Sequence, residues 1–268
     1  MIISQLPELF VQRERALLGP RFDAMFSYPG QGAARGASVN ALRCTPQQFA
    51  ALADFPLEAS PFCASAFVVP QPDWKPGRHP YHHAGAFYAQ EPSASAPAAL
   101  LDVRPGMRVA DLCAAPGGKS CLMAEMMQGT GRVQAWELHP HRADLIAAQV
   151  QRLGLENVRP MTRDALKHRE ELDGTMDIVL LDAPCSGLGV MSEKPDVKYR
   201  VTAQSVDELV QLQSNLLDAV CPYVKKGGTL VYSTCSVLKD ENVRQAEKFL
   251  ARHPEFELLP LPETIPAS

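Results

Sequence analysis

Apolar and polar residues follow two different patterns along the chain, and the change falls near residue 100. Before that point, residues 7–18 carry apolar side chains at helical spacing, which predicts an amphipathic helix. Thr45 precedes the segment "PQQFAALA" and is predicted to cap a second helix. Residues 56–99 are dense in proline, histidine and aromatic side chains. That composition favours an ordered, functional loop over regular structure.

After residue 100, short apolar runs alternate with segments of helical periodicity. The runs that predict strands are 108–113, 132–138, 158–162, 177–182, 228–233 and 256–261. Strands that alternate with helices form a parallel sheet covered by helices. We therefore predict an α/β fold: a Rossmann-like sheet in a domain over 101–268, preceded by a smaller α+β region over 1–100. Ligands of such sheets bind beyond the carboxyl ends of the strands, at the switch point.

Composition narrows the functional class. The chain has 268 residues and a net charge of −4, which argues against non-specific coating of nucleic acid but allows a local basic groove. No apolar run is long enough to span a membrane, and residues 1–20 lack the order of a secretory signal. The seven cysteines are spread out without a Cys-x-x-Cys pair. We expect a cytoplasmic protein with no metal site, no disulfide framework and no membrane contact.

The first candidate motif, "DLCAAPGGKS" (111–120), lies between a predicted strand and a predicted helix. A phosphate-binding P-loop needs glycine where Cys113 stands, and the dinucleotide fingerprint is also absent. An adenosyl ligand needs an acid at the end of the second strand, about 20 residues further on, to bind ribose. Glu137 has that place, and Asp164 follows the third strand, where it could meet the adenine amino group. These acids favour S-adenosylmethionine, with solvated loop acids as the alternative.

The second candidate motif is a pair of cysteines that follow two predicted strands. Cys185 comes after the strand 177–182, and Cys235 comes after the strand 228–233. These strands are neighbours in a doubly wound sheet, so both thiols are expected to face one crevice. The other cysteines outside the 111–120 loop are expected to be buried apolar side chains: Cys44, Cys63, Cys121 and Cys221.

A pair of thiols beside an adenosyl pocket suits methylation of cytosine at C5. A thiolate that adds to C6 of the ring makes C5 nucleophilic, and later elimination of the thiol restores the aromatic base. Asp182 is placed to stabilise the charge that develops on the ring. Because an ordinary thiol has a pKa of about 8.5, activation is required. Lys119 or neighbouring backbone dipoles could supply it.

Four segments together resemble one family: "DLCAAPGGKS", "DAPCSG", "KGGTLVYSTCS" and "YAQEPSASAPA". They are similar to the RsmB/NOP (Sun) family of RNA cytosine-C5 methyltransferases, and the first 100 residues resemble the N-terminal region of RsmF-type members. The resemblance implies a class I S-adenosylmethionine-dependent fold and small-subunit ribosomal RNA as substrate. We expect the protein to be a monomer. It implies that Cys235 attacks the base and Cys185 assists product release, whereas in DNA cytosine methyltransferases the Pro-Cys thiol attacks.

The resemblance also implies a set of site residues. The expected catalytic residues are Cys235, Cys185, Asp182 and Lys119. The expected cofactor-binding residues are Cys113, Ala114, Ala115, Pro116, Gly117, Gly118, Lys119, Glu137, Arg142, Asp164 and Asp182. The N-terminal region is expected to bind RNA, and Lys75, Arg78, Tyr81 and Tyr88 are candidates for stacking on it or steering it, with packing within the loop as the alternative for each.

One departure from the family pattern concerns the end of the chain. Only "PETIPAS" follows the predicted strand 256–261, so the seventh, antiparallel strand of the methyltransferase fold is expected to be missing. An uncovered sheet edge predicts reduced stability. The rival to an active enzyme is therefore a weakly active or inactive RNA-binding module. A methyltransferase directed at amino groups is a third reading, but it has no need of the thiols in "DAPC" and "STC".

Overall fold

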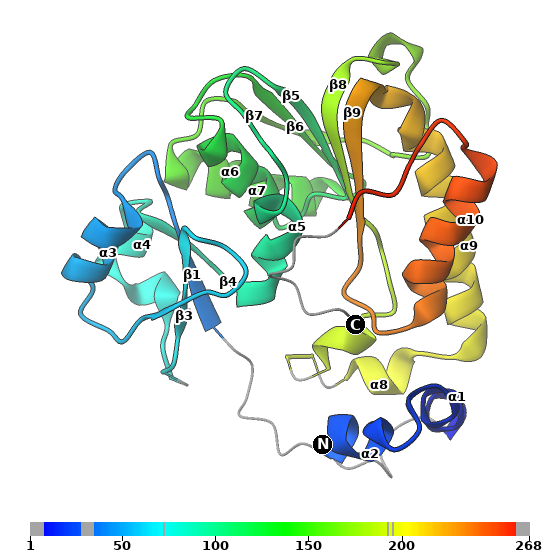
Figure 1. The fold of residues 1–268 in the computed structure, drawn as a ribbon. Helices are drawn as coiled ribbons and strands as arrows, with labels where there is room; N and C mark the ends of the chain where they lie inside the picture. The colour runs from blue at the N-terminus through cyan, green and yellow to red at the C-terminus, as the bar shows by residue number, and fades with distance from the viewer. Residues whose placement is uncertain (1–7, 28–34, 72, 192, 195, 261–268) are drawn as a thin grey trace. The chain divides into compact units, whose positions relative to one another are not determined.

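The computed structural model describes residues 8–27, 35–71, 73–191, 193–194 and 196–260. The chain forms two compact units, each built from separate segments (Figure 1). The sheet unit comprises Ala34–Ala183, Leu216–Ser233 and Pro254–Ser268. The thiol unit comprises Met1–Ala33, Pro184–Asn215 and Thr234–His253. The division of the chain near residue 100 into an RNA-binding region and a catalytic domain stays a prediction.

A five-stranded parallel sheet organises the sheet unit, in the order β7-β6-β5-β8-β9. Its strands are β5 (Arg108–Leu112), β6 (Arg132–Glu137), β7 (Val158–Thr162), β8 (Met176–Asp182) and β9 (Val224–Ser233). The order reverses beside β5: β6 and β7 extend to one side, and β8 and β9 extend to the other. The predicted α/β fold with a switch point is therefore confirmed.

Strands β8 and β9 are neighbours, as the sequence predicted. They pair in parallel up to Asp182 and Ser233, which lie opposite each other at the two strand ends. Strand β9 begins four residues earlier than the apolar run at 228–233 indicated. Its residues 225–227 are exposed, but Val224 pairs with Met176 of β8 before an irregularity in the register. The two carboxyl ends are thus fixed by the ladder of hydrogen bonds between the strands.

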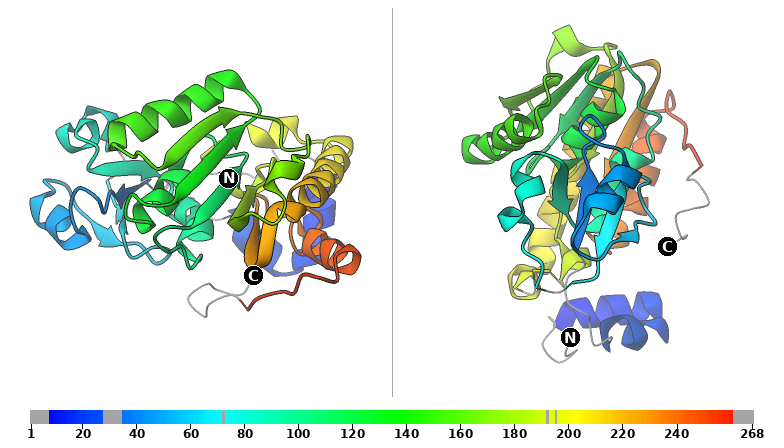
Figure 2. Two further views of the ribbon diagram at one scale, coloured as in Figure 1. Left: turned by 90° about the horizontal axis from the view of Figure 1, so that it is seen from above. Right: turned by 90° about the vertical axis from the view of Figure 1, so that its left-hand side faces the viewer.

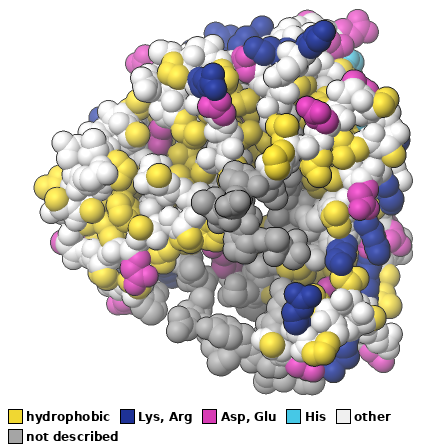
Figure 3. Space-filling model, viewed as in Figure 1, with side chains coloured by type: hydrophobic (Ala, Val, Ile, Leu, Met, Phe, Trp, Pro, Cys, Tyr) yellow, Lys and Arg dark blue, Asp and Glu magenta, His cyan; other side chains and the backbone are white. Residues whose placement is uncertain are grey.

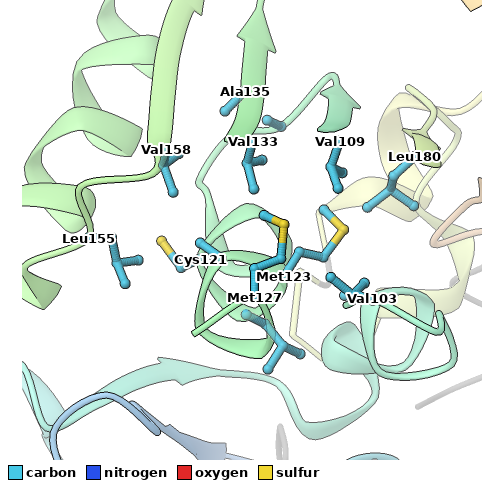
Figure 4. Close-up of a cluster of buried hydrophobic side chains, with 14 of the residues drawn as sticks. Val103, Val109, Cys121, Met123, Met127, Val133, Ala135, Leu155, Val158 and Leu180 are labelled. Atoms are coloured by element: carbon cyan, nitrogen blue, oxygen red, sulfur yellow. The ribbon is translucent and has the colours of Figure 1, made fainter. Parts of the chain in front are cut away.

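Helices α6 (Gly118–Met126) and α7 (Pro140–Leu153) pack against β6 and β7 (Figure 2). The core beneath them contains β-branched strand residues and the sulfur-containing side chains of Cys121, Met123 and Met127, each at most 1% exposed (Figure 4). Burial of each large side chain contributes about 1.5–3 kcal/mol, so this layer fixes where the loop before α6 can lie. Of the cysteines predicted as buried apolar residues, Cys63, Cys121 and Cys221 are buried and Cys44 is half-buried.

A second, four-stranded antiparallel sheet has the order β2-β3-β1-β4. Its strands are β1 (Arg35–Val39), β2 (Glu58–Ala59), β3 (Ala66–Val69) and β4 (Phe87–Gln90). The expectation of irregular structure over 56–99 is therefore wrong in part, since three of these strands and the short helices α4 (Pro80–His83) and α5 (Ala96–Ala99) lie within it. Prolines and histidines punctuate this segment, but its apolar runs still pair with β1.

Aromatic side chains fill the core of this second sheet. Phe49, Phe67, Trp74 and Phe87 pack with ring centroids about 5–6 Å apart. Phe49 belongs to α3 (Pro46–Leu52), which Thr45 caps as predicted: its hydroxyl accepts from the Gln48 N–H, and the Gln48 side chain accepts from the Thr45 N–H. The dense aromatics of this region are thus largely a packed core.

Two polar side chains join the second sheet to helix α7. The Asn40 amide, fully buried, donates to the carbonyls of Gly85 and Leu153 at 3.0 and 2.9 Å. Arg152 in α7 donates to the carbonyls of His82 and Phe87 at 2.6 and 3.0 Å. Both contacts satisfy backbone groups that burial would otherwise leave without partners.

The described part of the thiol unit is helical. It contains α1 (Glu8–Leu18), α2 (Arg21–Ser27), α8 (Val197–Arg200), the first part of α9 (Ala203–Val220), and α10 (Val243–Arg252). The predicted helix 7–18 is confirmed from Glu8 onward, and residue 7 lies outside the described residues. The apolar core of the thiol unit consists of Phe10, Phe22, Leu188, Met191, Val206 and Leu238. The described residues of both units also include short 3₁₀ turns: Pro76–Arg78, Pro92–Ser95, Glu170–Leu172, Leu188–Val190, Cys221–Tyr223 and Lys239–Glu241.

The predicted strand 256–261 is not a strand over its described residues, 256–260. Leu258 and Leu259 are 76% and 57% exposed, and Pro260 has no N–H to donate to a neighbouring strand. Residues 261–268 lie outside the described part. An apolar run becomes a strand only where a neighbour offers a ladder, and the described backbone beside β9 offers none beyond β8.

Three features of the described residues bear on function. No helix among them is long and apolar enough to cross a bilayer. They contain no cluster of three or more metal-ligating side chains. On the face drawn in Figure 3, the described Lys and Arg side chains are interspersed with acidic and apolar ones, in keeping with the net charge of −4.

Candidate active site

The loop from Cys113 to Gly117 connects β5 to α6. Two of its residues have left-handed backbone conformations: Cys113 with φ 75° and Gly117 with φ 107°. A Cβ atom at Gly118 would lie 2.5 Å from Gln90 Oε1 and 2.9 Å from the Tyr88 ring. Glycine is therefore required at 117 by the backbone conformation and at 118 by the packing of Gln90 and Tyr88. Neither requirement depends on a bound ligand. The compact turn leaves the backbone of Ala114 and Ala115 at the carboxyl end of β5.

Glu137 ends β6 as predicted, and its side chain is 2% exposed. Its Oε1 accepts from the His139 N–H at 3.1 Å and from Arg142 Nη1 at 3.4 Å. Arg142 also donates from Nη2 to the Ala115 carbonyl at 3.2 Å. The arginine thus ties the carboxylate to the loop after β5, so three of the predicted cofactor residues are brought together.

Asp164 follows β7 and is half-buried. Its Oδ1 accepts from the Leu166 N–H at 3.0 Å, which fixes the turn after the strand. The Asp164 carboxylate is thereby held at the same edge of the sheet as Glu137, one strand further along.

Lys119 and Asp182 form an ion pair between the start of α6 and the end of β8. Lys119 Nζ lies 2.9 Å from Asp182 Oδ2, and the two side chains are 17% and 33% exposed. Asp182 Oδ1 accepts from the Ser233 hydroxyl at 2.7 Å. Both carboxylate oxygens are therefore held, one by a charge and one by the neighbouring strand end.

Asp111, in β5, was not singled out from the sequence. It is fully buried, Oδ2 accepts from the Ser120 hydroxyl at 2.5 Å, and Oδ1 has no hydrogen-bond partner among the described residues. Burial raises the pKa of Asp111 to about 7. Burial, with the charge of Glu137 adding to it, raises the pKa of Cys113 to about 12, so that thiol keeps its proton. An acid within an apolar strand run was the available signal for Asp111.

These groups fit S-adenosylmethionine and not a phosphate ligand. Carboxylates occur at or within two residues of the ends of four successive strands: Asp164, Glu137, Asp111 and Asp182. The two cations among them, Arg142 and Lys119, are already paired with Glu137 and Asp182. Acids accept from ribose hydroxyls and attract a sulfonium or ammonium group, but they repel phosphate. The unpartnered Asp111 oxygen marks a place in this unit where a donor or a cation would satisfy a buried group.

The two cysteines of the thiol unit form a close pair. Cys185 Sγ and Cys235 Sγ lie 3.0 Å apart, and the Cys235 N–H donates to Cys185 Sγ at 3.3 Å. Cys235 is exposed and Cys185 is half-buried. The hydrogen bond with Cys235, reinforced by burial, raises the pKa of the Cys185 thiol. All seven cysteines are described, and none forms a disulfide.

The candidate RNA contacts fall into two groups. Tyr88 is 8% exposed, its hydroxyl donates to the Pro116 carbonyl at 3.4 Å, and it is therefore a packing residue of the loop after β5. Tyr81 is half-buried against the His79 ring. Lys75 and Arg78 are exposed and stay candidates.

Comparison with known proteins gives two family matches. Residues 98–267 match the family described as 16S rRNA methyltransferase RsmB/F, and residues 6–92 match the N-terminal domain of 16S rRNA methyltransferase RsmF. The cofactor of this family is S-adenosylmethionine.

Two curated relatives and one solved structure illustrate the likeness. The probable ribosomal RNA small subunit methyltransferase B of Bacillus subtilis is 42% identical over 65% of this chain and 39% of its own length. The ribosomal RNA small subunit methyltransferase F of Cronobacter sakazakii is 34% identical over 98% of this chain and 57% of its own length. A methyltransferase homologue from Pyrococcus horikoshii superposes with a TM-score of 0.81 at 29% identity, over 94% of this chain and 83% of that one.

The chain thus spans 39% and 57% of the lengths of these two curated relatives. The RsmB/F family model by itself matches residues 98–267, which is more than half of the chain. The chain therefore belongs to the RsmB/F family of methyltransferases.

Proposed function

We propose that this chain transfers a methyl group from S-adenosylmethionine to C5 of a cytosine in RNA, with small-subunit ribosomal RNA as its substrate. The pair of thiols 3.0 Å apart carries the proposal, because methylation at C5 needs a nucleophile for C6, whereas transfer to an amino group does not. The printed names of the two curated relatives support ribosomal RNA as the substrate.

Residues of the sheet unit would hold the cofactor. Glu137 would accept from the ribose hydroxyls, and Asp164 would accept from the adenine amino group. Asp111 and Asp182 offer carboxylates to the cationic part of the ligand, and the backbone of residues 113–118 would lie along it. When bound, S-adenosylmethionine supplies an electrophilic methyl group. Lys119 would orient the Asp182 carboxylate through their ion pair.

Cys235 would be the nucleophile. Its thiolate adds to C6 of the cytosine, and the electron pair of the C5–C6 double bond moves to C5, which then carries the nucleophilic density. After methylation, loss of the C5 proton to a base returns an electron pair to the ring, the C6–S bond breaks, and the Cys235 thiolate leaves. The exposure of Cys235 supports its role, since the attacking sulfur must reach a base.

Cys185 would be the acid of the pair. Its raised pKa means that it holds its proton when Cys235 is the thiolate, and a hydrogen bond from a thiol stabilises a thiolate 3.0 Å away. On elimination the same proton can neutralise the departing Cys235 sulfur. In the opposite assignment, Cys185 attacks and Cys235 assists; the half-buried position of Cys185 weighs against it.

The test uses ribosomal RNA that contains 5-fluorocytidine. Fluorine at C5 prevents the proton loss that precedes elimination, so the attacking thiol stays bonded to the RNA. With S-adenosylmethionine present, we expect wild type and Cys185→Ala to give a denaturant-resistant protein–RNA band and Cys235→Ala to give none. Cys44→Ser, a half-buried cysteine elsewhere in the chain, should behave as wild type.

Other outcomes are equally decisive. Loss of the band only in Cys185→Ala would reverse the two roles. Absence of a band in every protein, together with retained binding of the RNA, would favour the inactive RNA-binding module over the enzyme.

A further inference from the structure

A single buried carboxylate joins the two loops that carry the thiols. Glu241 lies in the 3₁₀ turn before α10 and is fully buried. It accepts hydrogen bonds from both serines that directly follow the cysteines: from Ser186 Oγ at 2.5 Å and from Ser236 Oγ. It also accepts from the Ser186 N–H at 2.8 Å. The two serine hydroxyls lie 3.0 Å from each other on the same carboxylate.

Two further side chains hold the remaining neighbours of the cysteines. The Gln213 amide, fully buried in α9, donates to Glu241 Oε1 at 3.0 Å and to the Pro184 carbonyl at 2.9 Å. Asn242 accepts from the Thr234 hydroxyl at 2.6 Å and donates to the Ser236 carbonyl at 2.8 Å. The residues before and after each cysteine are thus all tied to Glu241, Gln213 or Asn242.

Glu241 differs from its two partners because it alone among them binds both loops. Gln213 reaches only the loop of Cys185, and Asn242 reaches only the loop of Cys235. The Ser186 and Ser236 hydroxyls make their short contacts to Glu241, one residue beyond each sulfur. A displacement of either loop would therefore stretch buried hydrogen bonds, and a buried polar group that loses its partner is costly.

We propose that Glu241 is a positioning residue that sets the spacing between the Cys185 and Cys235 thiols. The relevance of this spacing to methylation rests on the proposed function, because the two thiols must act in turn on one base. The spacing itself is a property of the thiol unit and can be measured without RNA or cofactor. Wild-type thiol geometry with no methylation would contradict the proposed function and leave this inference intact.

The readout is the equilibrium between the two thiols and a disulfide. In mixtures of reduced and oxidised glutathione, two protein thiols and one glutathione disulfide give one protein disulfide and two glutathione thiols. The equilibrium constant measures how often the two sulfurs meet, which is their effective concentration. Alkylation after acid quench, followed by mass spectrometry of the peptides that contain Cys185 and Cys235, gives the ratio.

Glu241→Ala removes the carboxylate bridge and should lower the disulfide-to-dithiol ratio about tenfold, because the two loops lose their common side-chain anchor and retain the hydrogen bond from the Gly189 N–H to the Cys235 carbonyl. Glu241→Gln should stay near wild type, since serine hydroxyls can accept as well as donate and an amide can bridge them. Asn157→Ala is the matched control: its buried amide donates to the Ala124 and Thr130 carbonyls in the sheet unit, so its loss destabilises the chain without touching either thiol loop.

A folded Glu241→Ala protein with the wild-type ratio would overturn the proposal, and so would an equal fall in Asn157→Ala. If Glu241→Ala does not fold, the double variant Ser186→Ala and Ser236→Ala removes the two hydroxyl links and leaves the carboxylate bonded to the Ser186 N–H and Gln213. That variant should also lower the ratio, and a wild-type value in it would likewise overturn the proposal. In methylation assays, Glu241→Ala should lower kcat while leaving the KM for S-adenosylmethionine near its wild-type value.

Discussion

The acid-lined strand ends of the sheet unit and the thiol loops of the other unit are held in place by different means. Glu137 and Asp182 are the last residues of strands, so the parallel ladder fixes their backbones before any side chain contributes. Cys185 and Cys235 lie beyond the ladder, in loops whose flanking residues are held by the side chains of Glu241, Gln213 and Asn242. A binding group at a strand end is thus positioned by the strand that carries it. A reactive pair in two loops instead needs side-chain hydrogen bonds that hold both loops.

The largest expected effect lies on the thiol side. Cys235→Ala should reduce methyl transfer to ribosomal RNA by about 10³-fold or more, because no other group can form the covalent adduct. Incorporation of radiolabelled methyl groups into RNA measures it. Cys185→Ala should instead transfer the methyl group and then stall as a covalent complex with ordinary cytidine. Equal residual activity in both variants would contradict a division of labour between the thiols.

Among the acids of the sheet unit, Asp111 should affect how the stability of the protein depends on pH. The pKa of Asp111 is about 7 when folded and 3.8 ordinarily, so between about pH 4 and pH 7 the folded chain holds a proton that the unfolded chain has released. The contribution of Asp111 to the free energy of unfolding therefore falls by a few kcal/mol as pH rises through this window. Asp111→Asn should make the fall shallower, as urea midpoints between pH 5 and pH 7 would show.

Glu125 provides the matched comparison for that experiment. Burial raises its pKa to about 8, so it contributes a fall of the same sign over a window that extends higher. Glu125→Gln should flatten the curve up to pH 8, whereas the effect of Asp111→Asn should be complete near pH 7. Identical pH profiles for wild type and Asp111→Asn would show that Asp111 is ionised in the folded chain.

Glu137→Ala tests whether the carboxylate at the end of β6 binds the cofactor. The loss of charge-assisted hydrogen bonds to ribose should cost about 3 kcal/mol, which is about a 10²-fold higher Kd for S-adenosylmethionine. Isothermal titration calorimetry measures it. The exposed Glu156→Ala, an acid outside the strand ends, should leave the Kd unchanged. A wild-type Kd for Glu137→Ala would exclude Glu137 from the cofactor site.

The smallest expected effect is that of Thr45→Ala, which should change stability but neither cofactor binding nor thiol reactivity. Thr45→Ala removes the cap of α3 and should lower the free energy of unfolding by about 1 kcal/mol. Neither the Kd for S-adenosylmethionine nor the reactivity of the thiols should change. A change in either would mean that general destabilisation contributes to the effects expected of the other variants.

Strand ends were the part of the site that could be predicted from the sequence. Apolar runs at 108–113 and 177–182 placed β5 and β8 within a residue or two, and the acids after such runs followed directly. The prediction of a strand at 256–261 was wrong over the described residues. The apolar pattern of the leucines cannot show whether a neighbouring strand is available for pairing, and in the structure these leucines are exposed. Glu241 could not be recognised either, since an acid beside Asn242 at a helix start reads as a solvated group unless its burial is known.

The Asn40 and Arg152 contacts have a consequence for how the sheet unit opens. Both side chains donate to backbone carbonyls across the boundary between the antiparallel sheet and helix α7. Separating the two layers would leave the carbonyls of Leu153, His82 and Phe87 without these donors, so neither layer should open alone. In native-state hydrogen exchange, the amides of β1 and β4 should exchange together with those of α7, as one cooperative foldon. The antiparallel sheet would then be part of the folding unit of the Rossmann-like sheet and not an appended module.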